Sequence, residues 1–568
     1  MLTSGRQMAP QRRRNRFQGQ FNLGGEQAEA DPLLELAFVE TGGYSAMESV
    51  RDPRCFVVAR TGSGKSAALQ HLQEKLPEHV IRVTPEDLSL PYVTDLQVFR
   101  FLESLGVNLD LFFIALWKHV LLVELIRHRY HIDSPNAKQN FITNLRQRIA
   151  RDPAKVQALA YLEEFEGKFW CEADERVRDI TTSFEKTIAA SASGAVGHPG
   201  FGVAAGGSIE AVSGVETRTQ SVDRYQRIVN QFQLARLNKM IAVLDEHILD
   251  SPQHQTYVVI DDLDRDWVDE AVANDLIRCL FRTVLDLKRV KHLKVLVALR
   301  TTIFEQLDFS HSRSGQEEKL RSLILNLKWT RPAIYDVLDA RAKAASVLSK
   351  TPQWASIDAV LPNANKTRGR PTDYILDRTL MRPRDAIAYT NQCIEVASGT
   401  SRVTWNVIHD AERAYSEGRL LALRDEWKAS HIDLDKALRV FSGVTTPLTR
   451  PEFTKVLHDV MLLPADETFR GVAWLTDLSS VYWTADLASE EWFDLYYPLT
   501  RLLYAIGFIG CARAASQSPT YSFDDPTFVD HACNLGEEAR FHLHPAFCVG
   551  LDIKDQRAAR AQGIEDEH

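Results

Sequence analysis

The sequence predicts an α/β protein built on a parallel β-sheet, and three apolar stretches predict it. Residues 55–59 run directly into a glycine-rich turn that ends at Lys65. Residues 256–260 stop at a cluster of acids, and residues 292–299 stop at Arg300. Strands buried on both faces of a parallel sheet read as such continuous runs. Their carboxyl ends meet at one edge, so we expect the residues that follow them to form a site there.

Length and spacing divide the chain into five parts. At 568 residues it is too long for one hydrophobic core. The spacing of about 200 residues between Lys65 and the second apolar run exceeds that of a compact phosphate-binding domain. We therefore expect a flexible basic arm over 1–30, a P-loop α/β core over 31–330 with a helical insertion at about 95–250, a helical lid over 331–430, a winged-helix-like domain over 431–555 and a tail over 556–568.

The glycine-rich turn is typical of a phosphate-binding loop. Gly62 and Gly64 lack a Cβ, so backbone N–H groups can converge on phosphate oxygens, and the helix that follows directs its positive end at the same point. Lys65 would reach the β- and γ-phosphates of ATP, and the Ser66 hydroxyl would complete the shell of a Mg²⁺ ion. The predicted nucleotide contacts are Arg60, Thr61, Gly62, Ser63, Gly64, Lys65, Ser66 and Ala67.

The turn departs from the usual G-x-x-x-x-G-K-[ST] pattern at one position, where Ala59 replaces the first glycine. Alanine is the smallest substitute, and we expect the turn to keep its shape. The alternative is a chance Gly-Ser turn before a surface helix. The apolar strand before it and the helical spacing after it favour the phosphate loop.

The acids after the second apolar run complete the expected site. Asp261 would hold Mg²⁺, directly or through water, and Asp262 would polarise the attacking water. Because aspartate is one methylene shorter than the glutamate often found in this role, we expect slow hydrolysis. The alternative is a strand-end turn with a helix cap, since aspartate is favoured at both.

Two arginines are candidates for reading the γ-phosphate. Arg300 follows the strand predicted beside the acidic one, although it could instead cap that strand or pair with Asp261 or Asp262. Arg382 and Arg384 flank a proline that suits the first turn of a helix. Arg384 is the better candidate for a contact from a neighbouring helical domain, and an ordinary surface helix start is the alternative.

Helical spacing dominates the predicted insertion, over about 95–187, with segments at 138–149 and 156–169, and a long helix at 223–249. The most apolar stretch, 109–126, contains Asp110 and Lys118 among other polar residues, so we expect a buried helix and not a membrane span. Residues 191–213 are rich in glycine, and a hairpin and a loop both fit them.

Composition argues against a strongly basic nucleic-acid-binding protein, a secreted protein and a disulfide-linked protein. The chain has 67 basic and 76 acidic residues, a formal net charge of −9, so any DNA contact needs a local basic face. The first thirty residues lack a secretory apolar core and carry a basic run at 12–16. Seven scattered cysteines, without a C-x-x-C pair, indicate reduced thiols in a cytoplasmic protein; they are Cys55, Cys171, Cys279, Cys393, Cys511, Cys533 and Cys548.

The C-terminal third predicts helices at 433–442, 449–460 and 495–506, then a turn at 507–510 and strands at 518–523 and 541–545. Helices followed by two short strands suggest a winged helix, which binds DNA or packs against a neighbouring domain. No dense basic patch marks this region, so packing is favoured. His542 and His544 alternate on a strand, and without a third ligand we expect a strand face and not a metal site.

These residues together resemble bacterial P-loop ATPases of the KAP and STAND type. The resemblance covers about residues 30–400 and rests on Gly62–Ser66, Asp261–Arg265, Leu299–Thr301 and Arg382–Asp385. A poorly characterised bacterial group is especially similar, sharing stretches like Leu116-Trp117-Lys118 and Leu299-Arg300-Thr301-Thr302-Ile303-Phe304-Glu305. The resemblance implies an additional-strand ATPase core, a helical lid, often a winged helix, and nucleotide-dependent assembly in signalling, genome upkeep or phage defence. KAP-type membrane segments are missing, so no membrane role is inherited.

We therefore expect a cytoplasmic switch that binds and hydrolyses Mg²⁺-ATP and couples nucleotide state to domain arrangement or assembly. Its expected partners are ATP, further copies of the chain, and a protein or DNA at the C-terminal domain, with no membrane. Two alternatives stay open. One is a DNA-binding regulator in which ATP is structural, and the other is a scaffold that binds nucleotide without turnover.

Overall fold

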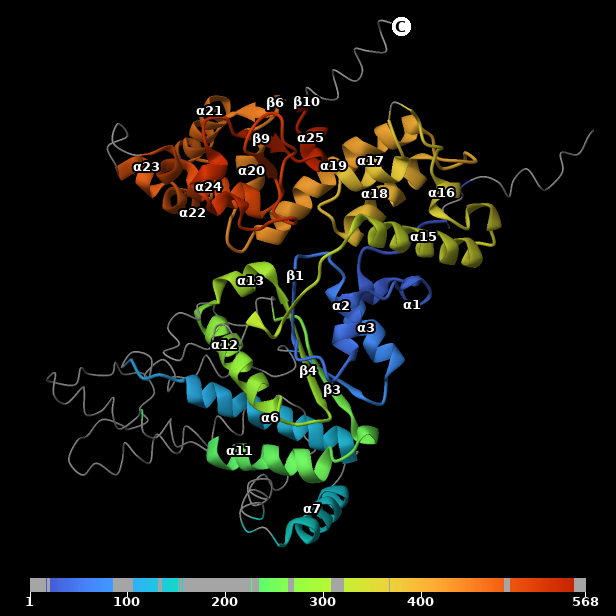
Figure 1. Ribbon diagram of the computed structural model, residues 1–568, viewed down its shortest axis with the longest axis vertical. Helices are drawn as coiled ribbons and strands as arrows, with labels where there is room; N and C mark the ends of the chain where they lie inside the picture. The colour runs from blue at the N-terminus through green and yellow to red at the C-terminus, as the bar shows by residue number, and fades with distance from the viewer. Residues whose placement is uncertain are drawn as a thin grey trace, which may run out of the picture. The chain divides into compact units, whose positions relative to one another are not determined.

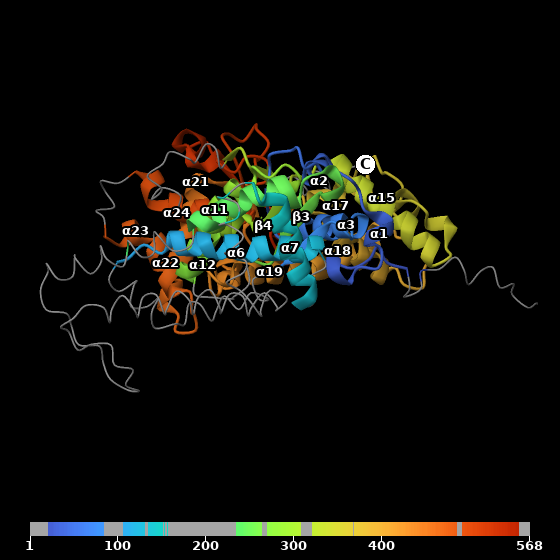
Figure 2. The same ribbon diagram turned by 90° about the horizontal axis from the view of Figure 1, so that it is seen from below.

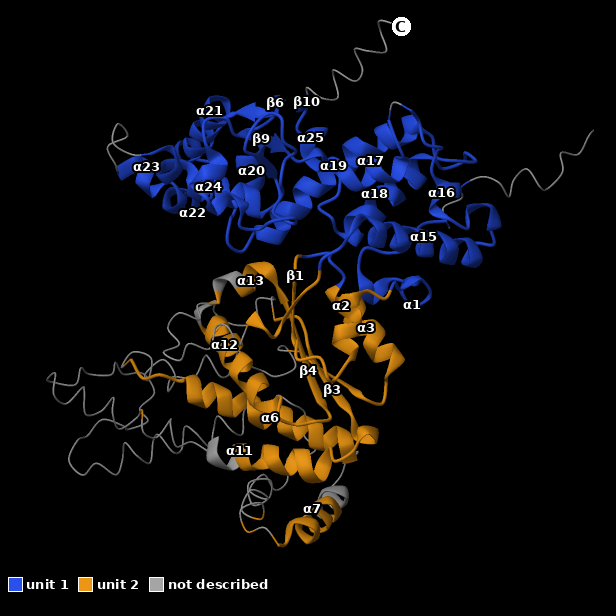
Figure 3. Ribbon diagram, viewed as in Figure 1, with its two compact units in different colours: residues 1–39, 61–64, 328–568 blue, residues 40–60, 65–327 orange. Residues whose placement is uncertain are grey.

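The computed structural model describes residue 17 and residues 21–84, 106–130, 135–151, 153, 156, 226, 234–263, 270–307, 321–366, 368–484 and 491–555 (Figure 1). The chain forms two compact units (Figure 3). The sheet unit comprises residues 40–60 and 65–327. The helical unit comprises residues 1–39, 61–64 and 328–568, so that four residues of the glycine-rich turn group with it.

The sheet unit is an α/β structure around five parallel strands, as predicted. The strands are β1 (Phe56–Ala59), β2 (Val80–Val83), β3 (Thr256–Ile260), β4 (Leu293–Arg300) and β5 (Ile324–Asn326), in the order β2-β3-β4-β1-β5. β1 and β3 are buried along their whole length, which explains their unbroken apolar sequence. β4 lies between them, in register with both, with Ala59 opposite Arg300. Strand β5 was not predicted, because it has only three residues and its exposure varies along it.

The sheet unit also contains the helices α2 (Gly42–Glu48), α3 (Lys65–Lys75), α6 (Asp110–Tyr130), α7 (Pro135–Ile149), α11 (Leu234–Val243), α12 (Glu270–Leu287) and α13 (Thr301–Gln306). A π-helical turn, Leu244–Ile248, continues α11. Helix α6 lies beside α11 and α12 in both views (Figures 1 and 2). Its predicted burial is confirmed, because Trp117 and Lys118 are each 1% exposed.

Contacts of α6 explain the Leu-Trp-Lys stretch without a catalytic role. The Trp117 indole donates to the carbonyl of Leu276 at 2.9 Å, and the Lys118 ammonium donates to Asn238 Oδ1 at 2.6 Å and to Asp286. These bonds join α6 to α11 and α12. A buried ammonium with these partners holds helices together. Most of the predicted segments 156–169 and 223–233, and all of 191–213, lie outside the described residues.

The helical unit begins with the segment that we expected to be a flexible arm. Residues 21–30 instead pack against the helices, since Phe21 is 3% and Leu23 0% exposed. The ring of Phe17 stacks on Trp354 at 4.1 Å. The predicted arm therefore does not extend through residues 21–30, because its apolar side chains enter a core that composition alone does not reveal.

That core is built from three longer helices and three short ones: α1 (Leu34–Ala37), α15 (Arg331–Leu348), α16 (Ile357–Val360), α17 (Pro371–Asp377), α18 (Pro383–Val396) and α19 (Trp405–Trp427). Thr330 caps α15 and Thr404 caps α19, each accepting a backbone N–H with its side chain. Pro383 begins α18, as the sequence predicts.

Beyond α19 a second core forms in the same unit. Its elements are α20 (Leu434–Arg439), β6 (Thr445–Thr446), β7 (Leu448–Thr449), α21 (Arg450–Met461), α22 (Val472–Leu478), α23 (Ser480–Thr484), α24 (Trp492–Ala505), β8 (Ile509–Ala512), β9 (Arg540–Leu543), α25 (Pro545–Cys548) and β10 (Lys554–Asp555). Strands β7, β9 and β8 form an antiparallel sheet in that order.

Two predictions in this region were wrong. Residues 509–512 form β8 where we expected a turn, and residues 518–523 form no strand apart from a bridge between Thr520 and Cys511. Gly510 is needed for packing and not for a turn, because a Cβ there would lie 2.5 Å from the Tyr521 ring. The turn itself is at Gly507, with φ +80°.

Candidate phosphate-binding site

The glycine-rich turn joins β1 to α3 with the backbone shape that its sequence predicts. Gly62 has φ +77° and Gly64 has φ +85°, which are backbone conformations that residues with a side chain rarely adopt. Ala59 is the last residue of β1 and keeps regular strand pairing, which explains why glycine is not required there. The Lys65 ammonium donates to the Ala59 carbonyl at 3.1 Å, so its side chain folds back across the turn.

Two residues of the helical unit hold this turn. The side chain of Arg384 packs on Gly62, where a Cβ would lie 3.0 Å from Arg384 Cβ, and the Arg384 backbone N–H points at the Gly62 carbonyl at 3.4 Å. The Trp329 indole N–H donates to the Ser63 carbonyl at 2.9 Å. Trp329 was not predicted as a site residue, since it follows β5 and lies 266 positions from its partner.

Asp261 follows β3 and is 5% exposed. Burial raises the pKa of its carboxyl above the ordinary value, and the nearby Arg82 and Lys65 charges offset only part of this effect. Arg82 Nη2, from β2, lies 3.6 Å from Asp261 Oδ2. That oxygen is nevertheless buried without a hydrogen bond among the described residues. An orphaned buried carboxylate oxygen fits a cation, and Arg82 was not foreseen.

Asp262 is the next residue and has a left-handed backbone, with φ +61°. Aspartate adopts this conformation more readily than most residues, but it still costs free energy. The outlier lies at the carboxyl end of a buried strand, where open α/β sheets bind ligands. Asp264 and Arg265 lie outside the described residues.

The other predicted site residues occupy less constrained positions. Arg300 ends β4, beside Ala59 in the register, and is the residue before α13. Ser66 and Ala67 lie in the first turn of α3, partly exposed, next to Lys65. The Thr61 hydroxyl is buried and makes no hydrogen bond within the described part of the chain.

The two arginines around Pro383 have different surroundings. Arg382 is 6% exposed and its guanidinium donates to Glu426 at 2.8 Å, so it holds α18 to α19. Arg384 is half-buried, and its Nε donates to the Glu26 carbonyl at 3.1 Å. These contacts leave Arg384 as the member of the pair that touches the phosphate-loop sequence.

Asp385 completes the start of α18. Burial opposes its ionisation, but the Arg419 and Arg382 guanidinium groups hold its pKa below the ordinary value. Its carboxylate accepts the Leu380 N–H at 3.1 Å and an Arg419 N–H at 2.7 Å. The Arg-Pro-Arg-Asp stretch therefore combines a loop contact with a structural ion-pair network.

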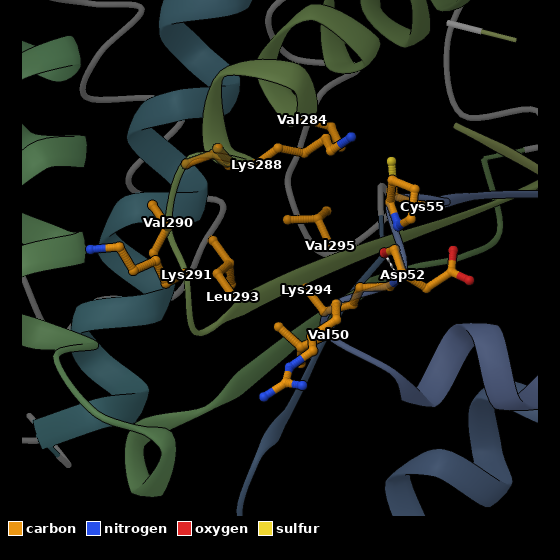
Figure 4. A pocket seen from close by; sticks show the side chains of 13 residues that line it. Val50, Asp52, Cys55, Val284, Lys288, Val290, Lys291, Leu293, Lys294 and Val295 are labelled. Carbon is orange, nitrogen blue, oxygen red and sulfur yellow. Dashed lines mark hydrogen bonds between the residues drawn. The ribbon is translucent and has the colours of Figure 1, made fainter. Parts of the chain in front are cut away.

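A separate pocket lies at the opposite, amino end of the strands. It has a volume of about 180 Å³ and is lined by Cys55, Lys288 and Lys291 among others (Figure 4). Lys294 in its wall is 4% exposed and gives its three N–H groups to the carbonyls of Ala46, Ser49 and Asp52. This lysine fixes the chain before β1, and the pocket is not the phosphate site.

The remaining observations concern histidines, cysteines and apolar helices. His544 Nδ1 accepts the Ala546 N–H and caps α25, and no cluster of three metal-ligating side chains occurs among the described residues. None of the six described cysteines forms a disulfide, although Cys533 is exposed. Within the same part of the chain, no helix has the length and apolarity needed to cross a bilayer.

Comparison with known proteins identifies one part of the chain. Residues 332–424 match the model of the FunZ-associated C-terminal helical domain. The matched region runs from α15 into α19 and contains Arg384. No curated protein matches the chain.

Proposed function

We propose that this chain binds and hydrolyses Mg²⁺-ATP, and that the nucleotide state controls the arrangement or assembly of its parts. One observation carries the proposal: a glycine turn with two left-handed residues joins a buried parallel strand to a helix, and Asp261 follows β3 at the carboxyl edge of the same parallel sheet. A cradle for phosphate and an unsatisfied carboxylate for Mg²⁺ are what such a site requires.

Each site residue of the sheet unit would have its own role. Lys65 would neutralise the β- and γ-phosphates, while Ser66 and Asp261 would bind Mg²⁺, which supplies positive charge to the transferred phosphoryl group. Asp262 would accept a proton from the attacking water. Its short side chain and constrained backbone favour slow turnover. A nucleotide-binding scaffold without turnover is the second candidate, supported by the same two features of Asp262.

The two remaining arginines would report the γ-phosphate. Arg300 ends the strand between β1 and β3. Arg384 comes from the helical domain and packs on Gly62. Only ATP offers a γ-phosphate for the Arg384 guanidinium to contact. Because ATP and ADP would then interact differently with the helical unit, the bound nucleotide would bias the arrangement of the parts of the chain.

The family proposed for the chain is that of KAP- and STAND-type P-loop ATPases. Its support is the strand order β2-β3-β4-β1-β5, in which an additional strand separates the loop strand from the acidic strand. For residues 431–555 we propose a winged-helix-like domain. Its support is three helices, α20, α21 and α24, combined with the antiparallel order β7-β9-β8.

Steady-state ATPase assays and nucleotide-binding measurements test the proposal. Lys65→Ala should reduce ATP turnover at least about 100-fold, as expected for loss of a charge that stabilises the transition state. Asp262→Asn should keep ATP bound but unhydrolysed. Lys75→Ala, at the far end of α3, is the matched control and should behave as wild type.

Normal hydrolysis by the Lys65→Ala protein would refute the assignment. Tight ATP binding by the wild type without any phosphate release would select the scaffold instead.

A further inference from the structure

The carbonyl groups of the glycine turn have partners in the helical unit. Gly62 O faces the Arg384 N–H, and Ser63 O accepts the Trp329 indole N–H. The second bond is the shorter of the two, at 2.9 Å against 3.4 Å. Both peptide units are trans, because the only cis bond in the described chain lies before Pro447.

A trans peptide unit is planar, with its C=O and N–H pointing in opposite directions. Fixing the Ser63 carbonyl on Trp329 therefore directs the Gly64 N–H to the other side of the turn. The Gly62 carbonyl does the same for the Ser63 N–H. Glycine on both sides of Ser63 leaves these peptides free to rotate unless something holds them, and an anion site of this kind needs its N–H groups aimed in advance.

Trp329 is suited to hold a peptide in place. Its ring packs against the hydrophobic core of the helical unit, and the next residue, Thr330, caps α15. Trp329 Cζ2 also lies 3.7 Å from where a Gly64 Cβ would be, so the ring touches both residues of that peptide.

We propose that Trp329 is a positioning residue that orients the Ser63–Gly64 peptide for phosphate, so that the helical domain sets the affinity of the loop for the β-phosphate of a nucleotide. The inference rests on the proposed function and deepens it. Phosphate binding is then coupled to the packing of Trp329 at the start of α15. By linkage, whatever displaces Trp329 weakens the binding of the nucleotide.

The test measures dissociation constants of the full-length protein for ADP, AMP and inorganic tripolyphosphate, with Mg²⁺. Trp329→Phe removes the N–H but keeps an aromatic ring. The loss of one orienting hydrogen bond should raise the dissociation constants for ADP and tripolyphosphate about three- to tenfold, and should leave that for AMP within twofold of the wild type. Trp405→Phe is the matched control, because its indole N–H donates to the Asn363 carbonyl in the same unit, away from the turn.

The outcomes separate this inference from the proposed function. A wild type that binds neither ADP nor tripolyphosphate refutes both. If Lys65→Ala loses ADP while Trp329→Phe binds it as the wild type does, the positioning role alone is refuted. Equal weakening of ADP and AMP would mean a general structural role, which also overturns it. Should Trp329→Phe fail to fold by circular dichroism, Trp329→Met, which also lacks the donor, takes its place with the same expectations.

Discussion

Asp261 is the residue at which stability and proposed function oppose each other. Its buried carboxylate has an oxygen without a hydrogen bond, and burial raises its pKa. Asp261→Asn should therefore raise the free energy of unfolding at pH 7 by about 1–2 kcal/mol, the usual scale for a poorly compensated buried polar group, and abolish Mg²⁺-dependent ATP turnover. Urea unfolding of both proteins at several pH values measures the first effect.

The sign of the pH dependence follows from linkage. Because the folded pKa of Asp261 lies above the unfolded one, the unfolded chain loses its proton first, and the wild type loses stability as pH rises through the folded value. The advantage of Asp261→Asn should vanish below about pH 4 and grow above it. An asparagine variant less stable than the wild type at pH 7 without Mg²⁺ would contradict this account.

Residues of the candidate site differ in how far the sequence can predict them. Lys65 and Asp261 are each tied to a local pattern, a turn or an apolar strand, that carries its own physical reason. Trp329 and Arg82 have no such local pattern, because tryptophan and arginine are common in or next to strands. The partner of each lies far away along the chain. The sequence around Ser63 and Asp261 does not predict these partners.

At the scale of elements, a buried ion pair adds to the apolar contacts that hold the segment before the first strand. Asp31 Oδ2 accepts from Arg341 at 2.6 Å, with the two side chains 1% and 8% exposed. Asp31 Oδ1 also accepts the backbone N–H groups of Gly25 and Leu33. This pair fastens residues 21–37 to α15.

Asp31→Ala should destabilise the helical unit by about 3–5 kcal/mol, since it leaves the Arg341 charge buried without its partner. Limited proteolysis should then cut within residues 21–37. Asp373→Ala, which breaks the exposed Arg370 pair at 3.0 Å, is the control and should leave the urea midpoint close to that of the wild type, because solvent screens such a pair. A comparable loss in both variants would show that the segment is held in another way.

Elements follow from the sequence where periodicity is strong and burial is one-sided or complete. β1, β3, β4 and α6 were predicted because their apolar runs are long or unbroken. The segment 21–30 and β8 were not, because each depends on contacts with residues outside its own local sequence pattern. The sequence around Gly510 resembles a turn, but pairing with His542 of β9 makes Gly510 a strand residue, and the Tyr521 ring against it leaves no room for a side chain.

For the molecule as a whole, charge decides between the proposed partners of residues 431–555. This region holds nine lysines and arginines against eighteen aspartates and glutamates. In a winged helix, α24 would be the helix that enters the major groove, yet its one basic residue, Arg501, pairs with Asp530 at 3.3 Å. Such a surface repels the phosphate backbone, so we expect the domain to contact protein.

Fluorescence anisotropy with duplex DNA tests this expectation on the full-length chain. Any binding should be weak, fall steeply between 50 and about 200 mM salt, and disappear on deleting residues 1–16, which carry the basic run. Arg501→Glu should leave the remaining affinity unchanged within about twofold, because the side chain is already neutralised by Asp530. Sequence-dependent DNA binding that survives the deletion and is lost in Arg501→Glu would instead make α24 a recognition helix and the chain a DNA-binding regulator.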